Sequence, residues 1–159
     1  MAPVDELWAE LHEVFVHDDG SLPEFVLVDV PAGAQRALLD RLLEQGHTDD
    51  TIWDPSRDRD VRVSELRDAG GRLPTFHALF TGIRIDGVEL PALGAFFIGD
   101  ELALDYRAGP EWTPDTVAAL ARFLVELRDL APGACVAWRA DGGDTLQRLD
   151  ELLDRSVAS

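Results

Sequence analysis

Histidine, cysteine and aspartate side chains could do chemistry in this chain, but their spacing argues against a catalytic or metal site. His12 and His17 are five positions apart, whereas zinc ligands on one helical face are four apart. Cys135 falls in an expected interior strand, where a thiol acts as a small hydrophobic group. His77 is the strand histidine that could approach it. We therefore expect no catalytic residue and no metal ligand here.

Several enzyme classes are excluded by the residues that are missing. The chain has no lysine, so it lacks the phosphate-binding lysine of a P-loop and the nucleophile of a Schiff-base enzyme. No G-x-G-x-x-G follows an expected strand, and no G-x-S-x-G turn is present. We expect neither a cofactor nor a serine hydrolase.

An acidic stretch at residues 47–60 is expected to form a long polar loop. Its five aspartates fall within twelve residues: Asp49, Asp50, Asp54, Asp58 and Asp60. Such a loop could gather around Ca²⁺ or Mg²⁺, but it lacks the glycine and closing glutamate of an EF-hand loop. Arg57 and Arg59 also alternate with the acids, which favours self-neutralising charge over a metal site. A metal-dependent hydrolase using Asp54, Asp58, Asp60 and His47 stays an alternative.

The overall charge is the strongest indication of a partner. The chain has 31 acidic and 14 basic side chains, a net charge of -17. Such a surface repels nucleic acid and anionic lipid and speeds encounters with basic surfaces. We therefore expect a basic protein partner, with no nucleic acid and no membrane. The lack of lysine and asparagine also fits a GC-rich genome, so a proteome-wide acidity remains an open alternative.

Tryptophan placement suggests which residues would contact such a partner. Trp8 and Trp138 match core periodicity, whereas Trp53 lies in the acidic stretch and Trp112 follows Glu111 just before a helix. Indole is favoured in binding hot spots and receives cations on its face, although each ring could instead cover the core edge. The predicted partner-binding set is Asp49, Asp50, Trp53, Asp54, Asp58, Asp60, Glu111 and Trp112.

Hydrophobic periodicity predicts a helix at residues 3–15, an interior strand at 24–30 and a second helix from residue 34 to Gly46. Residues 75–107 switch to strands, with hairpin turns at Asp86-Gly87 and at Gly99-Asp100. The first turn places Arg84 opposite Glu89.

The C-terminal third contains the clearest helix start. Thr113-Pro114-Asp115 combines an N-cap threonine, proline at the first helical position and an acid in the first turn. A short strand is expected at residues 134–138, and Asp144 is expected to cap a last helix. The order of elements predicts one α+β domain over residues 1–159, with helices packed on a mainly antiparallel sheet of about five strands.

The hydrophobic content of 46% is that of a globular protein, and no apolar run reaches the roughly 20 residues that span a bilayer. The lone cysteine and the missing leader pattern favour a cytoplasmic location. We therefore expect an acidic, non-enzymatic binding protein of bacterial type, such as an immunity protein or an inhibitor that masks a cationic site. A structural or oligomerising module, which would expose a large apolar surface, is a further alternative.

Overall fold

A computed structural model describes residues 3–157 except 69 and 142. Its helices and strands, in chain order, are α1 (Pro3–Val16), β1 (Glu24–Val28), α2 (Gln35–Gln45), β2 (Thr51–Asp54), β3 (Arg59–Arg62), β4 (Phe76–Phe80), β5 (Arg84–Ile85), β6 (Val88–Glu89), β7 (Leu93–Ile98), β8 (Glu101–Asp105), α3 (Pro114–Asp129), β9 (Cys135–Arg139), β10 (Gln147–Arg148) and α4 (Asp150–Val157). Short 3₁₀ turns precede α2 (Ala32–Ala34) and follow β3 (Val63–Glu65).

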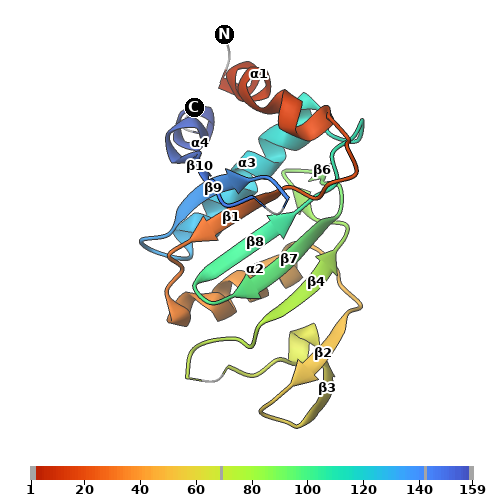
Figure 1. The fold of residues 1–159 in the computed structure, drawn as a ribbon, viewed down its shortest axis with the longest axis vertical. Coiled ribbons are helices and arrows are strands. Elements are labelled where there is room, and N and C mark those ends of the chain that lie inside the picture. The colour runs from red at the N-terminus through yellow and green to blue at the C-terminus, as the bar shows by residue number, and fades with distance from the viewer. Residues whose placement is uncertain (1–2, 69, 142, 158–159) are drawn as a thin grey trace.

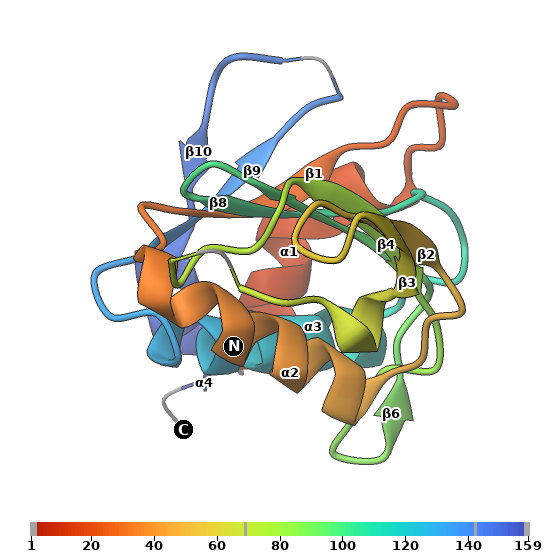
Figure 2. The same ribbon diagram turned by 90° about the horizontal axis from the view of Figure 1, so that it is seen from below.

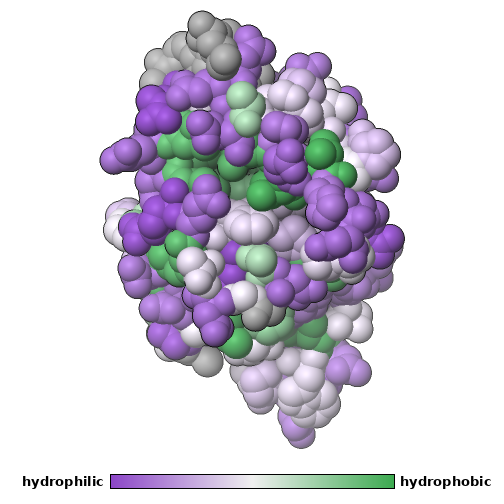
Figure 3. Space-filling model, turned by 45° about the horizontal axis from the view of Figure 1, so that its top comes forward, coloured by the Kyte–Doolittle hydropathy of each residue, from purple (hydrophilic) through white to green (hydrophobic). Residues whose placement is uncertain are grey.

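The main sheet has six strands in the order β10-β9-β1-β8-β7-β4, and every neighbouring pair is antiparallel. This confirms the α+β prediction, with one strand more than the expected number of about five. The four helices lie on one side of the sheet (Figures 1 and 2). We call the opposite side of the sheet the open face. Figure 3 looks obliquely onto this face and onto the end with α1 and α4, and hydrophobic residues form separate groups there among hydrophilic ones.

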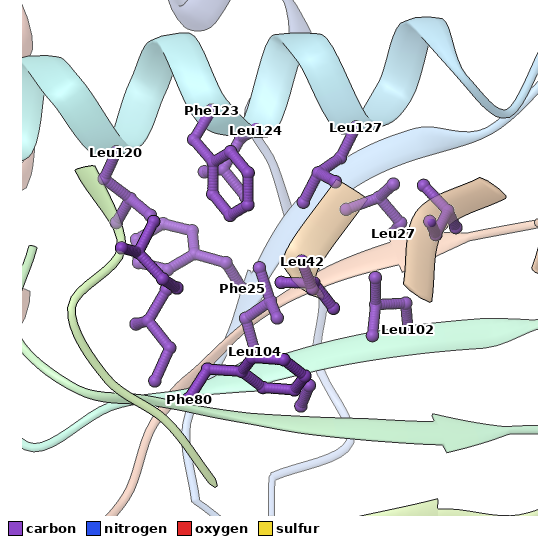
Figure 4. Packing of buried hydrophobic residues seen from close by; sticks show 14 of the residues in the cluster. Phe25, Leu27, Leu42, Phe80, Leu102, Leu104, Leu120, Phe123, Leu124 and Leu127 are labelled. Carbon is purple, nitrogen blue, oxygen red and sulfur yellow. The ribbon is translucent and has the colours of Figure 1, made fainter. Parts of the chain in front are cut away.

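The core lies between the sheet and α3 because the strand residues alternate in direction. Phe25 and Leu27 of β1 point toward the helices and meet Leu120, Phe123, Leu124 and Leu127 of α3 (Figure 4). Val26 and Val28 point to the open face, where they form a small second cluster with Ala103. Strand β1 is therefore interior and apolar on both faces, as its sequence predicts.

Both hairpin turns have the predicted register. Arg84 lies opposite Glu89, and Asp86 and Gly87 between them have φ values of 51° and 81°, the left-handed pair that a type I′ turn requires. Strands β7 and β8 meet through Phe97↔Leu102 across the second turn. However, β5 and β6 form their own small sheet, because Pro91 follows β6 and cannot donate to a continuing ladder.

The start of α3 is also confirmed, whereas the start of the last helix is not. The Thr113 hydroxyl accepts from the backbone N–H of Thr116, and the Thr116 hydroxyl accepts from Thr113 N–H, a reciprocal cap. The last helix, α4, begins at Asp150 and not near Asp144. Leu146 instead packs on the open-face cluster, which draws this segment across the sheet and away from a helix.

The acidic stretch is not a loop, and this expectation was wrong. Strands β2 and β3 form a hairpin in which Ile52 pairs with Val61. Val61 is buried in the main core, and Ile52 packs against it. The inward-facing residues Ile52 and Val61 thus favour pairing of the two strands, although the many charged residues mask this alternation in the sequence. We call residues 51–62 the acidic hairpin.

None of the helices within the described residues is long and apolar enough to cross a membrane.

Candidate interaction surfaces

The acidic hairpin is stabilised by one of its own carboxylates. Asp54 has a relative exposure of 0%, and its Oδ1 accepts hydrogen bonds from the Ser56 N–H (2.9 Å) and hydroxyl (2.7 Å). The hydrogen bond from the Ser56 hydroxyl lowers the pKa of Asp54, so the group remains charged. The Arg57 Nε lies 3.8 Å from the other oxygen. Asp54 therefore holds the turn and does not reach a partner, contrary to its place in the predicted set.

Trp53 is the exposed aromatic residue of the hairpin. Its side chain is 54% exposed and lies on the outer face, across from Asp60. Arg62 is on the same face, opposite Thr51. The indole is thus accessible, as the sequence suggested, but both signs of charge surround it.

Two further predicted residues bind the protein's own groups. The Asp50 carboxylate accepts the backbone N–H of Leu79 at 2.7 Å, which fastens the hairpin to the edge strand β4. Asp49 is almost fully exposed and lies 2.9 Å from the Nε2 of His47. Asp58 occupies the turn with a φ of 54°, a conformation that aspartate tolerates. Of these carboxylates, Asp49 and Asp58 are the more available to a partner.

Arginine offsets most of the charge in this region. Residues 49–72 contain seven carboxylates and five arginines, a net charge of -2. Arg57 reaches Glu65 at 3.4 Å as well as Asp54. The density of aspartate that singles out this stretch in the sequence therefore does not make a strongly negative surface.

Trp112 is a core residue and not a surface anchor. It is 2% exposed, its ring centroid lies 4.7 Å from that of Phe15, and its Nε1 donates to the Arg107 carbonyl. The chain folds back here because Gly109 N–H donates to the Phe15 carbonyl. Glu111 is exposed on this segment. The segment lies near the end of α1, whereas the hairpin of β2 and β3 lies at the opposite end of the molecule (Figure 1).

The candidate catalytic and metal residues do not converge. His77 on β4 and Cys135 on β9 are separated by the three strands β7, β8 and β1. Asp54 points inward while Asp60 lies on the outer face of the hairpin, and His47 bonds to Asp49. Over residues 3–157 without 69 and 142, no three His, Cys, Asp or Glu side chains are placed to share a metal ion.

The open face carries a histidine–carboxylate pair that the sequence analysis did not find. His77 Nε2 lies 2.7 Å from an oxygen of Asp105, and the two side chains meet above Gly94 of the intervening strand β7. A Cβ on Gly94 would lie 2.4 Å from Asp105 and 2.5 Å from His77, so the glycine makes room for the pair. The register of three strands creates this contact, and no local spacing signals it.

A second surface, also missed, lies between the end of α1 and the end of β9. It is a groove of about 260 Å³ that we call the α1–β9 groove. Its lining residues are Glu13, Val14, His17, Asp19, Ser21, Pro23, Trp138 and Ala140. The sequence indicates unneutralised negative charge in this part of the chain, because the first arginine is Arg36 and eight carboxylates precede it.

Neither family models, nor curated proteins, nor solved structures give a significant match to this chain. Its function must therefore be argued from these surfaces.

Proposed function

We propose that this protein is a non-enzymatic binding protein that engages a basic protein partner, in the manner of a bacterial, cytoplasmic immunity protein or inhibitor. The observation behind this proposal is the net charge of -17, because the chain has 31 acidic side chains and only 14 basic ones to neutralise them. Charge that is not neutralised internally is free to steer a cationic partner, which raises association rates more than it slows dissociation.

The acidic hairpin supplies a proposed contact surface. Trp53 is its anchor, because an exposed indole can bury a large area at small entropic cost. Asp49, Asp58 and Asp60 surround it with accessible carboxylates, and Asp50 fixes the hairpin against β4. Glu111 would contact a partner only on a separate side of the molecule.

Specific observations disfavour the two alternatives. A hydrolase would need its acidic residues and histidine to converge, namely Asp54, Asp58, Asp60 and His47. Instead, Asp54 accepts the hydrogen bond of the Ser56 hydroxyl, and His47 contacts Asp49. An oligomerising module would expose a contiguous apolar surface. The large exposed hydrophobic residues are instead dispersed over several elements: Val16, Leu22, Trp53, Leu79, Ile98 and Leu130.

The proposal is tested by capture from an extract of the native organism at low and at high salt. A basic protein should be retained at low salt and released at high salt, because screening weakens attraction between exposed charges. With the purified partner, a Trp53→Ser variant should dissociate faster. An Asp58→Ser/Asp60→Ser variant should associate more slowly with little change in dissociation. Retention of no basic protein at low salt would contradict the proposal.

A further inference from the structure

The α1–β9 groove is largely apolar at its base. Val14 comes from the last turn of α1, Pro23 from the segment before β1, and Trp138 and Ala140 from the end of β9. These surfaces suit the aliphatic part of a long side chain. Glu13 and Asp19 line the same groove, so carboxylates stand beside an apolar floor.

Hydrogen bonds hold the walls of the groove in place. The Trp138 Nε1 donates to the Tyr106 hydroxyl at 2.9 Å, and that hydroxyl donates to the Val14 carbonyl at 2.8 Å. Asp19 accepts the N–H of Ser21 at 2.9 Å, and the Ser21 hydroxyl also donates to it. Leu22 N–H donates to Asp141 at 3.0 Å, which connects the loop before β1 with the loop after β9. The groove is therefore preorganised.

Histidine, and not arginine, lies beside the carboxylates of the groove among the described residues, and His17 is itself one of the lining residues. Glu13 lies 3.6 Å from the His12 ring, and its side chain is 81% exposed. Over the part of the chain that the structure describes, no arginine forms an ion pair with Glu13, Asp18, Asp19 or Asp141. Arg139, at this end of β9, is held by Glu24 and by Glu101 at 3.3 Å.

We propose that the α1–β9 groove binds an arginine side chain of the basic partner. The stem lies on Val14, Pro23 and Ala140, and the guanidinium lies against the Trp138 indole within reach of Glu13 and Asp19. Guanidinium suits this site because it stacks on indole and donates to two carboxylates together. This inference rests on the proposed function and identifies the groove as the place where a cationic side chain of the partner binds.

Charge complementarity selects this occupant over an apolar or anionic one. An acidic segment would be repelled by Glu13, Asp18, Asp19 and Asp141, none of which is ion-paired with an arginine in the part of the chain that the structure describes. A purely apolar side chain would fill the floor but bury the carboxylates without partners, which is unfavourable. A cationic side chain with a long stem satisfies both parts of the groove.

The test uses a fluorescent peptide of six Arg-Gly repeats and a matched peptide in which neutral citrulline replaces arginine. Binding to the full chain is measured by anisotropy at low salt. A Glu13→Gln/Asp19→Asn variant is compared with an Asp58→Asn/Asp60→Asn variant, so that each loses two charges. Asparagine at residue 19 keeps an oxygen for Ser21, and at residue 58 it tolerates the positive φ.

We expect the groove variant to bind the arginine peptide about fivefold more weakly and the hairpin variant less than about twofold, in line with exposed charge contacts. Equal weakening by both variants, or a larger effect of the hairpin variant, overturns the groove proposal but leaves the proposed function standing. If the unmodified protein binds the arginine peptide no better than the citrulline peptide, the proposed function fails as well.

Discussion

The acidic hairpin and the α1–β9 groove carry the negative charge of this protein in opposite ways. Residues 49–72 have many aspartates, yet five arginines lie among them. The groove has fewer carboxylates, but no arginine precedes Arg36 and none pairs with its rim among the described residues. Local density of acid is therefore a weaker guide to a binding surface than the balance between acid and base.

The two regions also use their aromatic residues differently. The Trp53 side chain projects from the hairpin into solvent, whereas the Trp138 ring is held in place by its hydrogen bond to the Tyr106 hydroxyl. An exposed ring can change its orientation to fit a partner, but the protein's own structure does not hold it in the bound orientation beforehand. A fixed ring offers a preformed surface, which lowers the entropic cost of binding.

The largest expected effect comes from Tyr106, which supports the groove. A Tyr106→Phe variant leaves the Trp138 indole N–H and the Val14 carbonyl without their partner. Loss of such partly buried hydrogen bonds costs roughly 1–3 kcal/mol, so the free energy of unfolding in urea should fall by that amount. The variant should also bind the arginine peptide more weakly. Unchanged stability and binding would show that the Tyr106 contacts do not support the groove.

The same tyrosine predicts an alkaline transition. Burial raises the pKa of Tyr106 above the ordinary value near 10. Because the folded state holds the phenol proton more tightly, this stabilisation is complete below pH ~10 and is lost as the pH rises above it. The chain contains one tyrosine and no lysine, so the effect is easily isolated.

Urea unfolding from pH 8 to pH 11.5, an interval set by the ordinary value of about 10 for tyrosine, measures this dependence. The unmodified protein should lose more stability across it than Tyr106→Phe. Parallel curves for the two proteins would contradict the prediction.

Removal of groove charges should have a smaller effect on stability, opposite in sign. A Glu13→Gln/Asp18→Asn variant removes one lining carboxylate and its neighbour Asp18 outside the lining, and relieves repulsion between carboxylates that lack arginine partners, so its melting temperature should rise slightly at low salt. High salt should abolish the gain because it screens the repulsion. The matched Asp58→Asn/Asp60→Asn variant should not gain, since Arg59 and Arg62 are close in the hairpin. A higher melting temperature in the hairpin variant alone would mean that the unneutralised charge lies in the hairpin and not beside the groove.

The smallest effect on stability is expected at Trp53. Its side chain is more than half exposed, so Trp53→Ser should change the free energy of unfolding by no more than about 0.5 kcal/mol. Thermal and urea unfolding measure this directly. A larger loss would mean that the ring packs on the protein instead of serving a partner.

The sequence predicted best those elements that local chemistry defines. The turn at Asp86-Gly87 and the cap at Thr113 each depend on adjacent residues, and both have the expected geometry. The hairpin at residues 51–62 was missed because its pairing depends on only two apolar residues, Ile52 and Val61, within a charged stretch. The start of α4 was misplaced because Leu146 packs across the open face, a contact with no local signal.

The candidate surfaces were predictable only in part. The exposure of Trp53 agrees with its charged neighbours in the sequence, but the burial of Trp112 depends on the return of the chain to Phe15. The α1–β9 groove joins residues more than 100 positions apart, from Glu13 to Trp138. Sequence alone shows the absence of arginine before Arg36, but only the fold places those carboxylates beside an indole.

Arginine binding in the α1–β9 groove can be observed directly through the indole N–H signals of the ¹⁵N-labelled protein by NMR. The chain has four tryptophans, and their signals are assigned with single Trp→Phe variants. During titration with the arginine peptide at low salt, the Trp138 signal should shift most, the Trp53 signal less, and the buried Trp112 signal least. A shift at Trp53 without one at Trp138, or no shift with arginine beyond that with citrulline, would contradict the account.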